Sequence, residues 1–114
     1  MASEQQEIAD GTLLVRTGKN GDARTIALCG ELDLANASTA ESALQELLDA
    51  PGARVVVDMR ELEFIDSTGI ALLVSALDGD EGRPRIEFIP SPAPAVARVL
   101  ELTGLTERMP RADA

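Results

Sequence analysis

The chain has 114 residues, with 20 acidic side chains against 10 basic ones and a net charge of −10. Nucleic acids and anionic lipid surfaces repel such a chain, so we expect no nucleic-acid or membrane partner. The sequence contains no histidine, which excludes the Ser-His-Asp triad, the Cys-His dyad and histidine-ligated metal sites. We therefore expect a protein that is not an enzyme and holds no cofactor or metal.

The length fits one domain, which we place over residues 1–114, with a core at about 12–108 and frayed termini. The single cysteine, Cys29, lies in an apolar run and is predicted to be a buried, inert thiol. No stretch reaches the roughly 18 apolar residues that a membrane span needs, and no signal peptide is recognisable. We expect a cytoplasmic protein, and a monomer, because no long apolar stripe remains once the core is assigned.

The first half of the chain predicts a hairpin and a helix. Runs 12–18 and 23–32 are strand-like, and the Asn-Gly pair between them is typical of a tight turn between antiparallel strands. Residues 37–50 repeat apolar side chains at helical spacing. Ser38 and Glu41 have the spacing of a capping box at the start of this helix.

The second half predicts two further strands, each followed by a helix. Pro51-Gly52 should end the preceding helix, and 53–59 is an apolar run typical of a strand buried on both faces. Residues 85–89 form another strand, and 92–105 a helix. An amphipathic helix between them ends near Asp78-Gly79, and its predicted packed face consists of Ile70, Leu73, Val74 and Leu77.

This order predicts a single α/β domain, in which a mixed sheet (an antiparallel hairpin plus parallel strands) packs with about three to four helices. Right-handed crossovers bring the ends of the second and third strands to one edge of the sheet. These ends carry "GELD" (30–33) and "FIDSTG" (64–69). Because parallel sheets usually place function at the carboxyl ends of their strands, we expect the two polar clusters to be neighbours in space.

The segments "GELDLANA", "VVVDMRELEFIDSTGIALL" and "VARVLELTGL" resemble the anti-sigma factor antagonists of the STAS domain family, over about residues 12–108. The resemblance implies a partner that is both an anti-sigma factor and an ATP-binding serine kinase. The unphosphorylated antagonist binds this partner and frees the sigma factor; phosphorylation, here at Ser67, switches binding off, and a serine phosphatase restores it. The partner-binding residues that it implies are Asp33, Asp66, Ser67, Thr68, Gly69 and Ile70.

Each of these residues also has a structural interpretation. Asp66 or Ser67 can be a simple N-cap, and Asp33 can cap the turn that follows it. Thr68 can support the turn or accept a second phosphate. Gly69 can serve packing, by letting a partner or a neighbouring helix approach closely.

Two other classes of protein share parts of this pattern. A receiver domain also has a "VVVD" strand but needs a late lysine, whereas Lys19 is the only lysine here; Asp58 in that strand is more simply a structural acid. An aspartic protease needs Asp-Thr/Ser-Gly, and "DSTG" is one residue too long. The remaining alternative is a STAS module outside sigma-factor control: the scaffold of a stress-signalling complex or a subunit of a lipid-transport assembly.

Overall fold

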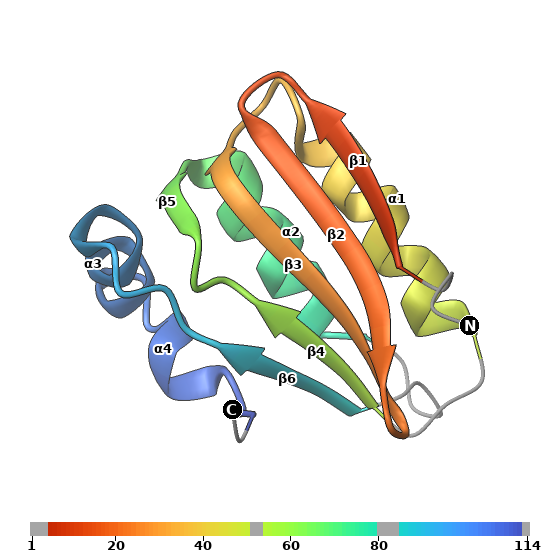
Figure 1. The fold of residues 1–114 in the computed structure, drawn as a ribbon. Helices are drawn as coiled ribbons and strands as arrows, with labels where there is room; N and C mark the ends of the chain where they lie inside the picture. Colours follow the sequence, from red (N-terminus) through yellow and green to blue (C-terminus); the bar gives the residue numbers. More distant parts are fainter. Residues whose placement is uncertain (1–4, 51–53, 80–84, 113–114) are drawn as a thin grey trace.

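The computed structural model describes residues 5–50, 54–79 and 85–112. Within these ranges six strands form one sheet, and four helices pack around it (Figure 1). The elements are β1 (Gln6–Asp10), β2 (Leu13–Asn20), β3 (Ala23–Leu32), α1 (Ala37–Asp49), β4 (Arg54–Asp58), β5 (Leu62–Ile65), α2 (Ser67–Leu77), β6 (Arg85–Ile89), α3 (Pro94–Leu102) and α4 (Leu105–Arg108).

The sheet is mixed, as predicted. Its strand order is β1-β2-β3-β4-β6, and β5 pairs with the carboxyl end of β3. The pairs β1–β2 and β2–β3 are antiparallel, whereas β3–β4, β3–β5 and β4–β6 are parallel. Helices α1 and α2 lie together over one face of the sheet, and α3 and α4 lie beside β5 and β6, at the end away from β1 (Figure 1). The protein is therefore a single α/β domain.

The N-terminal strand was not predicted. We expected the chain before about residue 12 to be frayed, but β1 pairs with β2 along its whole length, with Ile8 opposite Val15. The sequence of β1 is polar apart from Ile8 and Ala9 because four of its five residues are exposed at the sheet edge, so it lacks the apolar pattern of a buried strand. Near the other end of the described chain, Arg111 bridges to Phe88 of β6.

The prediction of a capping box at the start of α1 is wrong. The helix begins at Ala37 behind Asn36, whose side chain does not cap it, and Ser38 is already the second helical residue. The amide of Asn36 is engaged instead with the turn before the helix. The proposed stop at Pro51-Gly52 lies outside the described residues; α1 itself ends at Asp49.

The packed face of α2 is rotated from the predicted one. Leu73 is fully buried as expected, but the other buried residues are Gly69, Leu72 and Ala76. The predicted residues Ile70, Val74 and Leu77 lie at the margin of the core, half-buried. The rotation arises because α2 packs against α1 as well as against the sheet.

The last helix is divided in two. Pro94 is the first residue of α3, but α3 ends at Leu102 and α4 starts at Leu105. Gly104 separates them with a φ of 80°, a left-handed conformation that glycine adopts without strain.

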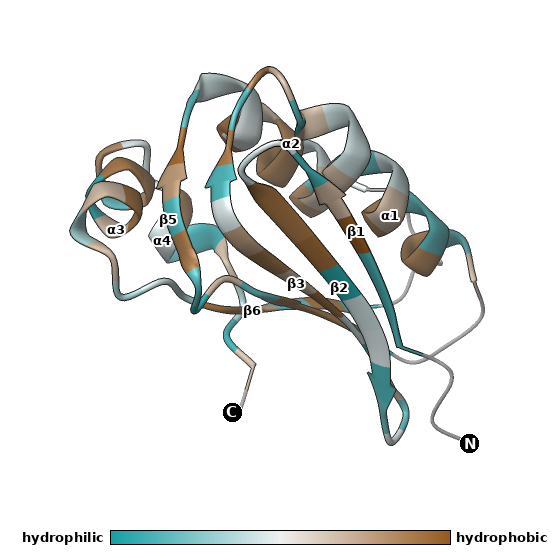
Figure 2. Ribbon diagram, turned by 45° about the horizontal axis from the view of Figure 1, so that its top comes forward, coloured by the Kyte–Doolittle hydropathy of each residue, from teal (hydrophilic) through white to brown (hydrophobic). Residues whose placement is uncertain are grey.

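The core lies between the sheet and the helices. Figure 2 shows the hydrophobic residues concentrated along the middle strands and on α2. This arrangement buries the largest apolar side chains almost completely: Phe88, Leu13, Ile26, Leu28, Leu32, Met59, Leu62, Leu73 and Leu105.

Candidate functional site

The site begins where β3 changes its pairing partner. Residues Ala23–Ala27 pair with β4, whereas the end of β3 pairs with β5, and the register shifts between Gly30 and Glu31. Gly30 has a φ of 99°, and a Cβ there would collide with the backbone oxygen of Thr12. Only glycine fits this bulge. The bulge directs the end of β3 toward β5, which brings the two polar clusters together; a glycine inside a strand-like run was a signal for it that the sequence analysis did not use.

Asp66 joins the two clusters. Its backbone N–H donates to the Leu32 oxygen at 3.1 Å. Its carboxylate Oδ1 accepts the backbone N–H groups of Thr68 and Gly69 at 2.9 and 3.1 Å, and Oδ2 accepts that of Leu34 at 3.1 Å. Asp66 is therefore the N-cap of α2 and also a tether for the loop after β3. The sequence-based expectation that the clusters are neighbours is confirmed.

The turn after β3 is held by Asn36, which the sequence analysis missed. Asn36 is 2% exposed. Its Oδ1 accepts the Asp33 N–H at 2.9 Å, and its Nδ2 donates to the Glu31 oxygen at 2.9 Å. Asp33 in turn accepts the Ala35 N–H through Oδ1 at 3.0 Å, which is the turn-capping interpretation of that residue. An asparagine immediately before a helix was the available signal for this role.

Ser67 is the first residue of α2, and its side chain is exposed. The first N–H groups of a helix lack partners within it, and the positive end of the helix dipole favours a nearby anion. The adjacent carboxylate of Asp66 accepts three backbone N–H groups, and among the described residues it accepts no hydrogen bond from the Ser67 hydroxyl. Ser67 is thus an accessible hydroxyl at an anion-tolerant position rather than an activated nucleophile.

Gly69 allows α2 to pack closely against the sheet. The residue is buried, and a Cβ on it would lie 2.6 Å from Ile65 Cγ1 and 3.0 Å from Leu32 Cγ. These close contacts fit the packing interpretation of Gly69, and its contribution to a partner surface stays a prediction. The other expected contact residues, Thr68 and Ile70, are half-buried.

Two large apolar side chains are exposed beside this junction, and the sequence analysis did not single them out. Leu34 is 77% exposed just after β3, and Phe64 of β5 is 44% exposed, opposite Glu31 in the β3–β5 pairing. A groove between α1 and α2 starts at Leu34 and Thr68. Exposed large apolar side chains near a polar site are candidate contacts for a partner protein. Apolar residues of this kind look like core in a sequence, which is why they were missed.

The pKa values of Asp58 and Cys29 are shifted from their ordinary values. Hydrogen bonds from Arg60 hold the pKa of Asp58 below its ordinary value, with Arg60 Nη2 at 2.8 Å from Asp58 Oδ2, so Asp58 is the structural acid that the sequence indicated. Burial, followed by the charge of Glu61, raises the pKa of the Cys29 thiol, and Cys29 is buried as predicted. Over the described ranges, no cluster of three potential metal-ligating residues is found, and none of the helices there could span a membrane.

The fold and the site define a small α/β domain with a polar, partly apolar edge where β3 and β5 end. A family model described as "Mlab, STAS domain" matches residues 15–111, and the chain therefore belongs to the STAS domain family.

Solved structures show the same fold at low sequence identity. The chain is similar to an anti-sigma factor antagonist from Mycobacterium paratuberculosis, with a TM-score of 0.81 and 21% identity over 93% of this chain and 90% of that one. It is also similar to SpoIIAA in its unphosphorylated form, with a TM-score of 0.63 and 21% identity over 87% and 88% of the two chains. For the Bacillus SpoIIAA in the phosphorylated form, the TM-score is 0.57 and the identity 20%, over 87% and 91%.

Proposed function

We propose that the protein is an anti-sigma factor antagonist without catalytic activity of its own. In this proposal the unphosphorylated protein binds an anti-sigma factor of the ATP-binding serine kinase type in the cytoplasm, as a monomer, and so releases a sigma factor. The kinase phosphorylates Ser67, which switches binding off, and a serine phosphatase reverses the change. The observation that carries the proposal is the exposed Ser67 hydroxyl at the start of α2, beside exposed apolar side chains.

The position of Ser67 suits a switch that leaves the domain folded. A phosphate adds about −1.5 to −2 charges at neutral pH, and the start of a helix tolerates an anion through the positive end of its dipole. The backbone around Ser67 is held by the Asp66 carboxylate, which accepts three N–H groups. Phosphorylation therefore changes what the surface presents while the scaffold beneath it stays in place.

The energetic cost of phosphorylation arises when the partner binds. A protein that packs against Leu34 and Phe64 brings its surface close to Ser67 and to the carboxylates of Asp33 and Asp66. Burying an uncompensated charge there costs about 3–5 kcal/mol, which corresponds to roughly two to three decades in affinity or more. We assign partner contact to Thr68 and Ile70 as well as to these residues, and a positioning role to Gly69.

The test is a titration of the partner kinase with variants of Ser67, followed by calorimetry. Ser67→Ala should bind within a factor of about two of the unmodified protein, because a missing hydroxyl leaves no charge to bury, whereas Ser67→Asp should bind at least about tenfold more weakly. Thr106→Asp is the matched control: Thr106 is exposed on α4, away from Ser67, and the same charge there should leave affinity unchanged. Equal affinities for Ser67→Asp and the unmodified protein would contradict the proposal.

The alternative from the sequence uses the same surface for a different purpose. A scaffold of a stress-signalling complex or a subunit of a lipid-transport assembly would bind its partner through the β3–β5 edge without needing an ATP-binding kinase. It predicts that a purified partner and ATP leave Ser67 unmodified, whereas the antagonist proposal predicts one added phosphate.

A further inference from the structure

β1 is an open edge of the sheet. It is the first strand in the sheet order, and among the described residues it pairs with β2 alone, with Ile8 opposite Val15. The opposite edge is covered in the described part of the chain: the Phe88 N–H donates to the Pro110 oxygen at 2.8 Å, and the Phe88 oxygen accepts from the Ala112 N–H at 2.9 Å. An open edge presents unpaired N–H and C=O groups that can pair with an added strand.

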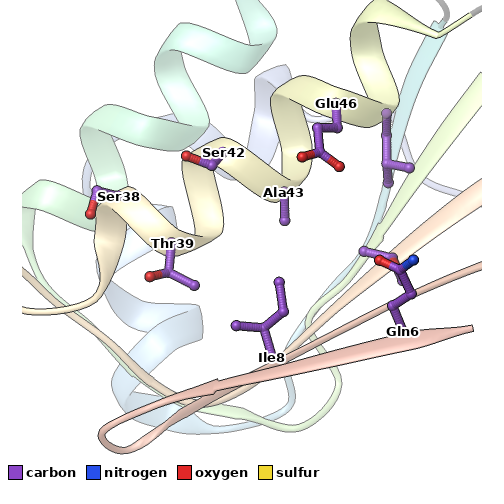
Figure 3. A pocket seen from close by; sticks show the side chains of 9 residues that line it. Gln6, Ile8, Ser38, Thr39, Ser42, Ala43 and Glu46 are labelled. Carbon is purple, nitrogen blue, oxygen red and sulfur yellow. The ribbon is translucent and has the colours of Figure 1, made fainter.

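A groove lies between β1 and α1, directly beside this edge (Figure 3), with a volume of about 290 Å³. Ile8 is 44% exposed and points from β1 into the groove, toward α1. Ala43 and Leu47 of α1 complete an apolar patch with it. An extended segment added to β1 would find both free backbone groups and an apolar contact for an alternate side chain.

The electrostatics of the groove favour a basic occupant. Glu46 is the one charged side chain among the described residues that line it. Asp10, at the end of β1, accepts a hydrogen bond from Thr39 Oγ1 at 2.6 Å, which holds β1 to α1 at that end. The chain as a whole carries a net charge of −10. A second copy of this chain is therefore a poor occupant, because two such acidic surfaces repel one another.

β1 lacks three of the devices that protect edge strands from pairing. Natural proteins place lysine, proline or a bulge on an exposed edge, and β1, "QEIAD", contains neither lysine nor proline and pairs with β2 in unbroken register. Its one acid outside the Asp10 contact, Glu7, forms an ion pair with Arg16 at 3.0 Å.

We propose that β1 and the adjoining groove form a second docking site, independent of Ser67, which accepts an extended segment of another protein as an added strand. The segment alternates apolar and basic side chains: an apolar side chain packs on Ile8 between β1 and α1, and a basic one meets Glu46. Main-chain hydrogen bonds along β1 supply affinity, and the groove supplies specificity.

The experiment uses the full chain and two short peptides of identical composition, fluorescently labelled. One peptide alternates valine and lysine; the other places its lysines in one block and its valines in another. The alternating peptide should bind saturably by anisotropy and shift the backbone amide signals of Gln6–Asp10 and of α1 in NMR spectra. Ile8→Thr, which keeps a β-favouring residue but removes the apolar contact, should weaken binding at least about tenfold, and Glu46→Gln should weaken it to a smaller extent.

Two control variants separate this site from other effects. Leu102→Thr removes a 77%-exposed leucine from α3 and should leave binding unchanged. Ser67→Asp should also leave it unchanged, so that failure here and failure of the proposed function are distinguishable. The proposal is overturned if the block peptide binds as tightly as the alternating one, if Ile8→Thr has no effect, or if sedimentation shows that β1 is covered by a second copy of the chain.

Discussion

One aspartate ends β4 and another directly follows β5, and the two have different roles. β4 ends at Asp58, whose carboxylate accepts hydrogen bonds from the backbone N–H and the guanidinium of Arg60. β5 is followed directly by Asp66, whose carboxylate accepts only backbone N–H groups, those of Leu34, Thr68 and Gly69. In the sequence, "VVVD" and "EFID" look alike; in the structure one acid is neutralised by its neighbour and the other organises two segments.

The comparison of Asp58 with Asp66 indicates which arrangement of polar residues suits the proposed switch. Asp58 and Arg60 form an ion pair with each other, so the acid at the end of β4 has a structural role. The Asp66 carboxylate accepts three backbone N–H groups and so fixes the turn at the start of α2. The next residue, Ser67, is exposed on this fixed turn. In the proposed function, Asp66 caps α2 and the adjacent Ser67 acts as the switch.

The largest expected effect tests the support beneath the Asp66 junction. Leu73 of α2 is fully buried, and Leu73→Ala should lower the free energy of unfolding by about 2–5 kcal/mol through a core cavity. Ser75→Ala, at an exposed position of the same helix, should change it by less than about 0.5 kcal/mol. Urea unfolding of the two variants gives the comparison, and equal stabilities would mean that the packed face of α2 is misassigned.

The next effect compares the two aspartates directly. Asp66→Ala removes an N-cap worth about 1 kcal/mol and the tether to Leu34, worth about another 1 kcal/mol, so we expect a loss of about 2 kcal/mol. Asp58→Ala removes a partly exposed ion pair and should cost less than about 1 kcal/mol. Denaturant melts at neutral pH measure both; a larger loss for Asp58→Ala would reverse the roles assigned here.

A smaller effect concerns pH. Because Arg60 holds the pKa of Asp58 below its ordinary value in the folded protein, the pair adds stability above the ordinary aspartate pKa and loses it as the pH falls through the folded value. Asp58→Asn should therefore be less stable than the unmodified protein at pH 7, by less than about 1 kcal/mol. That difference should shrink in acid, and a gap that widens on acidification would contradict the assignment.

The smallest effect is expected at Ser67. Protein carrying phosphoserine at position 67, made by genetic encoding, should unfold at a free energy within about 1 kcal/mol of the unmodified protein, since the start of α2 tolerates the anion. Thr106 modified in the same way serves as the reference for an exposed phosphate. A loss of several kcal/mol at position 67 would show that phosphorylation acts by unfolding the domain.

The sequence predicted the parts of the fold whose residues carry a periodic or turn signal. The hairpin joining β2 and β3, the buried β4, β6 and the neighbouring positions of "GELD" and "FIDSTG" all followed from such patterns. The sequence did not predict β1, because an exposed edge strand has no buried face and therefore no alternation of apolar and polar residues. The capping box failed because Asn36 is the residue before the helix and uses its amide for the turn before α1, which local spacing cannot reveal.

The sequence predicted where the candidate site lies, but not which role each of its residues has. The resemblance drew attention to Asp66 and Ser67, and the structure assigns the first to capping and leaves the second exposed. The bulge at Gly30 depends on contact with Thr12, a residue of the turn between β1 and β2. The exposure of Leu34 and Phe64 depends on how α1 and β5 are placed. Such tertiary contacts are not encoded in any short segment.

The central claim is that Ser67 is the phosphorylated residue. The most direct measurement is intact and tandem mass spectrometry of the protein after incubation with its partner kinase and ATP. The account predicts a single addition of about 80 Da, the mass of one phosphate on one hydroxyl, mapped to Ser67. It also predicts no addition to Ser67→Ala and an unchanged addition to Thr68→Ala. A phosphate on Thr68 or at any other position, or none at all, would contradict it.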